Sequence, residues 1–136
     1  MERNIKLLGC TLRDGAHLNE GHFGRKIIEE TIADLVEAKV DIIEVGFFDN
    51  KEHDDDHTYF SSIAEVKKIL PENKGSSMFS LMADFVDVDN VEPCDGTVEI
   101  FRLSFKRHRL DWALDSAKKL MEKGYKVYFE KNGRNK

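Results

Sequence analysis

An arginine, a carboxylate and an imidazole stand within five residues near the start of the chain, at Arg13, Asp14 and His17. Asp14 can bind a hard divalent cation through oxygen. Arg13 can hold a carboxylate or stabilise an enolate oxygen, because its charged guanidinium donates hydrogen bonds in a fork. His17 can move a proton near neutral pH. The same spacing also fits a salt-bridged turn around Gly15, so catalysis and structure both stay open on these residues alone.

Short apolar runs that alternate with amphipathic stretches must position these residues. The pattern predicts strands over 5–10, 41–48, 78–84, 97–104 and 125–130, and helices over 26–38, 59–70 and 110–123. Residues 85–96 are acidic and irregular. Strands that alternate with helices indicate an α/β fold with a parallel sheet and right-handed crossovers. In such folds the functional residues follow the carboxyl ends of the strands.

The composition sets the class of protein. The chain has 136 residues, a net charge of -5 and 40% hydrophobic residues, which is typical of one globular domain. The acidic balance argues against binding to nucleic acid or to anionic membranes. No apolar run approaches the roughly 18 residues of a membrane helix, and the first residues lack a signal-peptide core. The distant Cys10 and Cys94 are typical of free thiols, so we expect a cytoplasmic protein.

The run at 8–15 (LGCTLRDG) resembles the signature that opens the first strand of the metal-dependent aldolase and lyase barrels. That superfamily includes 4-hydroxy-2-oxovalerate aldolase, hydroxymethylglutaryl-CoA lyase, and the homocitrate and isopropylmalate synthases. Residues 43–47 (IEVGF) and 101–103 (FRL) are similar to its second and fourth strands, and the resemblance covers about residues 5–130. It implies the N-terminal portion of a (βα)8 TIM barrel, with about five parallel strands and flanking helices.

The resemblance also implies a role for each matching residue. Asp14 matches the aspartate that ligates a divalent metal, for which oxygen ligands favour Mn²⁺ or Mg²⁺. Arg13 matches the arginine that steadies the enolate of pyruvate. His17 matches the general base of the hydroxy-oxovalerate aldolase branch. Glu44 matches a glutamate that faces the barrel interior near the metal. The implied reaction is therefore aldol cleavage of a small 4-hydroxy-2-oxo acid to pyruvate and an aldehyde.

The sequence departs from the family pattern in two respects. Gly9 stands where many members carry an acidic residue, so Asp14 lacks that support. The family's His-x-His pair is absent, because no two of the five histidines are two apart. The last expected strand also ends at residue 130 and leaves a frayed tail over 131–136. We therefore expect residues 1–136 to form a single partial barrel, truncated after its fifth strand, that holds metal weakly and is weakly active or inactive alone.

Two further features of the sequence are open to more than one interpretation. Arg102 in a central strand is costly unless paired, so either Glu44 or Glu99 is its partner, or it helps to bind a substrate carboxylate. The run at 49–57 (DNKEHDDDH) offers many metal ligands, but such charge runs are usually solvated loops. Its position after the second strand places it on the active face, where it can form part of a substrate lid.

Two alternatives from other classes remain. A half barrel has two exposed sheet edges, so the chain is a candidate for a non-catalytic unit that assembles with itself or with a complementing C-terminal half. A flavodoxin-like receiver domain, phosphorylated on Asp84, also has five parallel strands in this length. Asp14, Ser104 and Lys131 stand at strand ends in the places that such a domain uses, but its paired acids after the first strand are absent.

Overall fold

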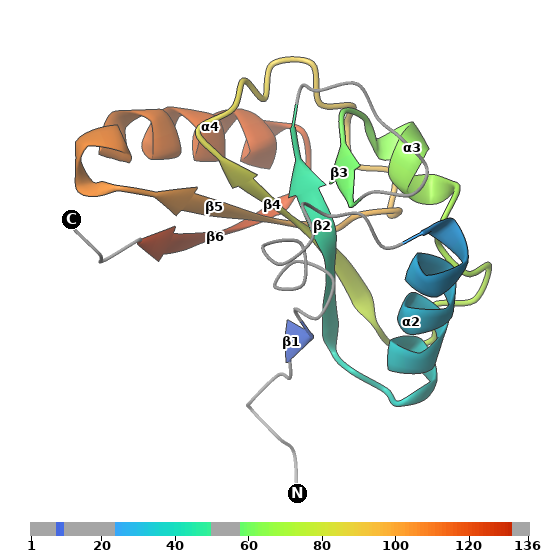
Figure 1. Ribbon diagram of the computed structural model, residues 1–136. Coiled ribbons are helices and arrows are strands. Elements are labelled where there is room, and N and C mark those ends of the chain that lie inside the picture. Colours follow the sequence, from blue (N-terminus) through green and yellow to red (C-terminus); the bar gives the residue numbers. More distant parts are fainter. Residues whose placement is uncertain (1–7, 10–23, 50–57, 132–136) are drawn as a thin grey trace, which may run out of the picture.

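The computed structural model describes residues 8–9, 24–49 and 58–131 (Figure 1). Within them a parallel sheet has the strand order β1-β2-β4-β5-β6, and a short strand β3 also pairs with β2. The strands are β1 (Leu8–Gly9), β2 (Ile42–Phe48), β3 (Tyr59–Phe60), β4 (Met78–Asp84), β5 (Ile100–Phe105) and β6 (Lys126–Lys131). The predicted parallel α/β fold is confirmed, and each of the five predicted strands corresponds to one of these strands.

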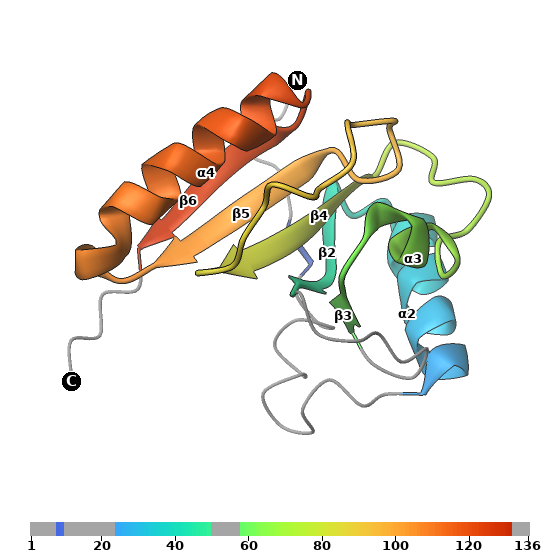
Figure 2. The ribbon, with the colours of Figure 1, turned by 90° about the horizontal axis from the view of Figure 1, so that it is seen from above.

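Helices lie along one side of this sheet. They are α2 (Arg25–Glu37), α3 (Ile63–Lys67) and α4 (Leu110–Glu122), and a 3-10 turn η1 (Arg107–Arg109) leads into α4. Figure 2 shows α4 running along β5 and β6, while α2 and α3 lie at the other end of the sheet. None of the helices in the described part of the chain is long and apolar enough to cross a membrane.

One hydrophobic core joins these helices to one face of the sheet. Alternate strand residues such as Val45, Leu81 and Leu103 point into it, and Ile32 of α2 and Leu120 of α4 meet them. The residues between them, of which Glu44 is one, therefore point to the opposite face. We call it the helix-free face, because none of the helices in the described ranges packs on it. The three described α-helices thus pack on one face, as in consecutive βα units of a barrel, whereas doubly wound sheets carry helices on both faces.

The strand order separates this fold from a flavodoxin-like receiver. In that fold the first strand lies between the second and the third, in the order 2-1-3-4-5. Here β2 pairs directly with β4, and β1 pairs with β2 from the other side. Asp84, Ser104 and Lys131 do lie at the carboxyl ends of β4, β5 and β6, as the sequence predicted. Their placement is thus common to both folds, and the observed order is not that of a receiver.

The predicted helix over 59–70 is wrong at both ends. Residues 59 and 60 form β3, and α3 begins only at Ile63. At the amino end the reason is a cap similar to a capping box: the Ser62 hydroxyl accepts a hydrogen bond from the Glu65 backbone N–H at 3.2 Å, and the Glu65 carboxylate accepts one from the Ser61 N–H at 2.9 Å. Tyr59 and Phe60 precede this cap, so they are outside the helix and pair with β2 as an extended strand. At the carboxyl end α3 stops at Lys67.

Gly46 permits the pairing between β2 and β3. The Phe47 N–H donates to the Thr58 carbonyl at 2.9 Å, which brings that carbonyl against Gly46. A Cβ atom at position 46 would lie 2.1 Å from the same oxygen. The register of β2 with β4 also shifts between Glu44 and Gly46, as at a β-bulge. Glycine at this position therefore combines a bulge with a close backbone approach.

The connection from β4 to β5 contains no helix, in keeping with the irregular segment predicted over 85–96. Val88 and Val91 fill the core in place of a helix. The Lys123 ammonium, just after α4, donates to the carbonyls of Val88, Asp89 and Val91 at 3.1, 2.7 and 2.7 Å. The Trp112 indole N–H donates to the Val86 carbonyl at 2.8 Å. Helix α4 therefore fastens this crossover at two points.

Candidate functional site on the helix-free face

Three charged side chains from three strands meet on the helix-free face. The Arg102 guanidinium of β5 donates from Nη1 to Glu44 Oε2 of β2 at 2.7 Å, and from Nη2 to Glu130 Oε2 of β6 at 3.0 Å. The Glu44 side chain is 0% exposed, that of Arg102 15% and that of Glu130 41%. The guanidinium thus bridges two carboxylates, one fully buried and one partly open to solvent. We call these three residues the Arg102 triad.

The triad decides between the partners that the sequence left open for Arg102. Of the two glutamates that the sequence left open, Glu44 is the one that Arg102 binds. Glu99, the other candidate, instead forms an ion pair with Lys74, whose ammonium also donates to the Gly96 carbonyl at 3.0 Å. A carboxylate as deeply buried as that of Glu44 is stable only beside a compensating charge.

Ser80 extends the polar surface next to the triad. It is fully buried and lies opposite Glu44 in the register of β2 and β4. Its hydroxyl has no hydrogen-bond partner within the described ranges. Ser80 and Glu130 were missed by the sequence analysis. Ser80 had a signal, since a hydroxyl interrupts the otherwise apolar run of β4; Glu130 had none, because its role depends on β6 lying beside β5.

The remaining predicted catalytic residues, Arg13, Asp14 and His17, lie outside the described residues. The strand that precedes them, β1, pairs with the start of β2, where Leu8 is opposite Ile42 and Gly9 is opposite Ile43. Glu44 belongs to the same strand β2 and follows Ile42 by two residues.

The other predicted ligands and thiols are only partly visible. Of the acidic run at 49–57, Asp49 is described, and residues 50–57 lie outside. In the part of the chain that the structure covers, no three His, Cys, Asp or Glu side chains form a group that could hold a metal ion. The metal prediction therefore depends on Asp14. Cys94 is a free thiol, as predicted, while Cys10 lies outside the described residues.

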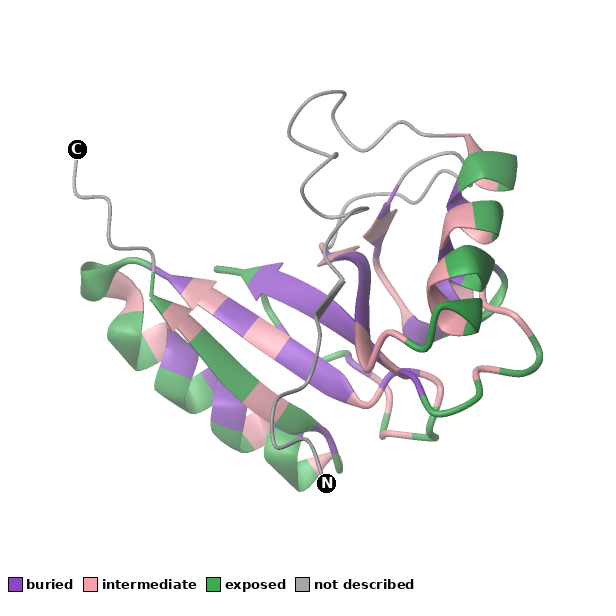
Figure 3. Ribbon diagram, turned by 90° about the horizontal axis from the view of Figure 1, so that it is seen from below, coloured by how far each residue is buried: buried purple, intermediate pink, exposed green. Residues whose placement is uncertain are grey.

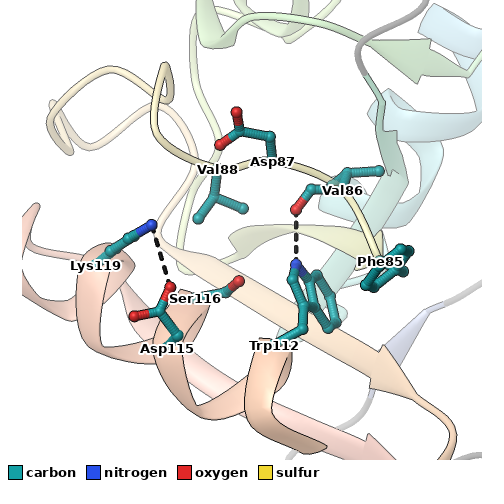
Figure 4. Close-up of a pocket in the computed structure, with 8 residues that line it drawn as sticks. All are labelled: Phe85, Val86, Asp87, Val88, Trp112, Asp115, Ser116 and Lys119. Atoms are coloured by element: carbon teal, nitrogen blue, oxygen red, sulfur yellow. Dashed lines mark hydrogen bonds and ion pairs between the residues drawn. The ribbon is translucent and has the colours of Figure 1, made fainter. Parts of the chain in front are cut away.

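A cavity of about 300 Å³ opens beside the carboxyl end of β4, between the segment that follows this strand and α4 (Figure 4). Its lining residues are Phe85, Val86, Asp87, Val88, Trp112, Asp115, Ser116 and Lys119. Because Val88 and Ser116 are buried between α4 and the sheet, this cavity lies on the helix side. It is therefore separate from the Arg102 triad.

Charged groups and a strained residue border this cavity. Lys119 forms ion pairs with Asp89 at 2.7 Å and with Asp115 at 3.1 Å, and hydrogen bonds to these carboxylates raise the pKa of Lys119. The same contact lowers the pKa of Asp89. Phe85 is half exposed with a left-handed backbone (φ 46°), and the Arg109 guanidinium lies 3.4 Å from its ring centroid. These groups satisfy one another, which favours a structural role for the rim.

A second cavity, of about 390 Å³, lies at the opposite end of the strands, where β4 and β5 begin. Phe79 near the start of β4, Thr97 before β5, and Lys74 contribute to its lining. Functional sites of parallel sheets gather at the carboxyl ends of strands, and this cavity is at the amino ends. The Arg102 triad extends from the middle of β2 to the carboxyl end of β6, and it remains the better candidate for a functional site.

A scan against models of protein families finds no match to this chain, and no curated protein matches its sequence. The function is therefore argued from the residues and their arrangement.

Proposed function

We propose that this chain carries part of the active site of a divalent-metal-dependent carbon–carbon lyase, which cleaves a 4-hydroxy-2-oxo acid to pyruvate and an aldehyde. The observation that carries the proposal is the buried Glu44–Arg102 ion pair on the helix-free face. In a barrel of consecutive βα units, that face is the interior. The run TLRDG, which follows β1 in sequence, supplies the residue types that such a reaction needs on the neighbouring strand.

Three residues outside the described ranges have the chemical roles. Asp14 is the residue that would hold Mn²⁺ or Mg²⁺, whose contribution in such a site is that of a Lewis acid. His17 accepts the proton of the 4-hydroxyl group as the carbon–carbon bond breaks. The electron pair of that bond passes to the 2-oxo group as the aldehyde departs, and Arg13 stabilises the resulting pyruvate enolate through hydrogen bonds from its guanidinium. Protonation of the enolate at C3 then gives pyruvate.

Arg102 acts as a positioning residue for Glu44 in this proposal. Both of its terminal nitrogens already bind carboxylates, and Glu44 is the more buried of the two. A substrate carboxylate that approached Arg102 would therefore displace Glu130, whose side chain is 41% exposed, rather than Glu44. The ion pair keeps Glu44 charged and fixed on the interior face.

The test is exchange of the methyl protons of pyruvate for deuterium, which reports enolate formation without an aldehyde. Because the metal site of this chain is incomplete, we expect the intact chain with excess Mg²⁺ or Mn²⁺ to catalyse only slow exchange, detected by mass spectrometry. Asp14→Asn and Arg13→Ala should abolish it. Asp34→Asn, an exposed carboxylate on α2, is the matched control and should leave the rate unchanged.

Metal binding gives a second readout that does not depend on turnover. Titration of Mn²⁺ followed by electron paramagnetic resonance should show a site that is lost in Asp14→Asn and kept in Asp34→Asn. Exchange that survives Asp14→Asn would refute the role of this carboxylate. An intact chain that neither exchanges pyruvate nor binds Mn²⁺ would refute the proposed function.

A further inference from the structure

The outer edge of β6 presents an unusual surface. Within the described ranges β6 pairs only with β5, and it does so over six residues without a register shift. Figure 3 shows that most of this strand is exposed. Tyr128 is 47% and Phe129 49% exposed. An open edge is a template for pairing with another strand, and proteins protect such edges by keeping them short, bulged or charged. Strand β6 has charged residues at Lys126, Glu130 and Lys131, but it is six residues long and has no bulge against β5.

The backbone geometry defines which residues of β6 face outward. The Lys126 N–H donates to the Glu99 carbonyl at 2.9 Å, so the polar groups of Lys126 point toward β5. Because these groups alternate in direction along a strand, Val127, Phe129 and Lys131 point their N–H and carbonyl groups away from β5. An antiparallel partner strand must therefore form its hydrogen-bonded pairs with these odd-numbered residues.

A second copy of β6 meets this requirement with matched side chains. When the two-fold axis passes at Tyr128, Val127 forms a hydrogen-bonded pair with Phe129 of the second copy. Lys126 then lies opposite Glu130 of the second copy, and Tyr128 opposite itself, as non-hydrogen-bonded pairs whose side chains are closest. Each interface of this kind contains two Lys–Glu pairs, two Val–Phe pairs and one Tyr–Tyr pair.

The neighbouring registers are less complementary. A shift of the partner in one direction places Val127 opposite Lys131 and Tyr128 opposite Glu130. A shift in the other direction places Lys126 opposite Tyr128. Of the three, only the register centred on Tyr128 pairs opposite charges and keeps apolar residues together, so charge complementarity selects it.

Helix α4 adds an apolar stripe beside this edge. Leu110, Leu114 and Met121 are about half exposed, and their spacing places them on one side of the helix. Trp112 and Lys119 occupy the opposite flank, which faces the segment that follows β4. Figure 2 shows α4 running over β5 and β6. Because the apolar stripe is on the flank opposite to Trp112 and Lys119, it faces away from β4 and toward the open edge of β6.

We propose that two copies of this chain associate through antiparallel pairing of their β6 strands around a two-fold axis at Tyr128. Val127 and Phe129 lie on the helix side of the sheet, so the same two-fold axis brings the apolar stripes of the two α4 helices toward each other. The association continues the sheet from one copy into the other. It does not depend on the proposed lyase chemistry.

The test is a charge-reversal pair on the intact 136-residue chain, followed by sedimentation velocity over a concentration series. We expect the unchanged chain to form dimers. Lys126→Glu and Glu130→Lys each place like charges opposite each other twice, so each should raise the dimer dissociation constant by at least about tenfold. Glu130→Lys also removes the carboxylate that binds Arg102 Nη2 at 3.0 Å, so Lys126→Glu, which leaves the Arg102 triad intact, is the decisive variant. An equimolar mixture of the two variants should form heterodimers, because both Lys–Glu pairs are restored. Lys131→Glu, opposite Tyr125 in this register, is the matched control and should dimerise normally.

A cross-linking variant tests the position of the axis. Tyr128→Cys should form a disulfide between copies under oxidising conditions, because non-hydrogen-bonded antiparallel pairs have the short Cα separation that a disulfide requires. Val127→Cys, opposite Phe129, should not form the equivalent bond with itself. Circular dichroism confirms that each variant is folded. A chain that stays monomeric overturns the proposal, and so does a dimer that ignores both charge reversals and fails to cross-link through position 128.

Discussion

Arg102→Met removes the guanidinium that lies 2.7 Å from the fully buried carboxylate of Glu44. Loss of one member of a buried ion pair typically costs about 3–5 kcal/mol, because the other charge stays in a low-dielectric environment. We therefore expect the free energy of unfolding to fall by about that amount. The reverse change, Glu44→Leu, should cost less, since Arg102 is 15% exposed and keeps Glu130 as a partner at 3.0 Å.

Urea unfolding measured by the fluorescence of Trp112, the single tryptophan of the chain, gives both values and that of the double variant. The double variant Glu44→Leu/Arg102→Met should recover most of the loss, because no buried charge remains. Additive single losses, or a cost below about 1 kcal/mol for Arg102→Met, would refute the view that this ion pair stabilises the helix-free face.

Three further changes test other parts of the fold. Gly46→Ala should destabilise the protein by at least about 2 kcal/mol in urea unfolding, since the new Cβ meets the Thr58 carbonyl at 2.1 Å; an unchanged midpoint would contradict the close approach. Lys123→Met should cost about 1–3 kcal/mol, because it leaves three crossover carbonyls without their ammonium donor; a neutral outcome would show that water replaces it. Burial raises the pKa of Tyr125 above its usual 10, so its contribution to stability is present below pH 10 and is lost at more alkaline pH. Ultraviolet titration should therefore show one late-ionising phenol, absent in Tyr125→Phe, and a normal titration of every tyrosine would contradict its burial.

The positions of the strands followed from sequence because buried strands leave a strong local signal. The apolar, β-branched run that contains Ile43 and Val45 predicted β2 to within one residue, and the limits of β4 were predicted without error. The failure at β3 has a local cause. Tyr59 and Phe60 fit a helical spacing with Ile63, and the competing cap at Ser62 was given no weight.

Helix α4 shows what periodicity leaves open. The helix predicted over 110–123 has apolar residues at helical spacing, which include Leu110, Leu114 and Met121, but only the part of this face around Ala117 and Leu120 is buried. A repeat of apolar residues fixes which side of a helix is apolar and not how much of that side a neighbour covers. How much of the apolar face of α4 is buried depends on which elements pack against the helix.

The candidate site was predictable to the extent that chemistry restricts partners. A charged residue in a central strand requires a countercharge, which narrowed the partners of Arg102 to Glu44 and Glu99. To choose between these two glutamates, one must know which face of the sheet each side chain points to. The sequence does not give this, and in the structure Glu99 precedes β5 and pairs with Lys74. The contact of Glu130 with Arg102 could be predicted only from the order of strands in the sheet. Glu130 belongs to β6, which is separated from β5 in sequence by helix α4.

The Lys123 ammonium, which three crossover carbonyls surround, has a consequence for the motions of the protein. A connection without its own helix would ordinarily open independently and expose its amides to exchange with solvent. Here one cation joins the backbone around Val88 and Val91 to the end of α4. The amides of the connection and of the last helical turns should therefore become accessible in the same opening event, as one cooperative unit with a shared opening free energy.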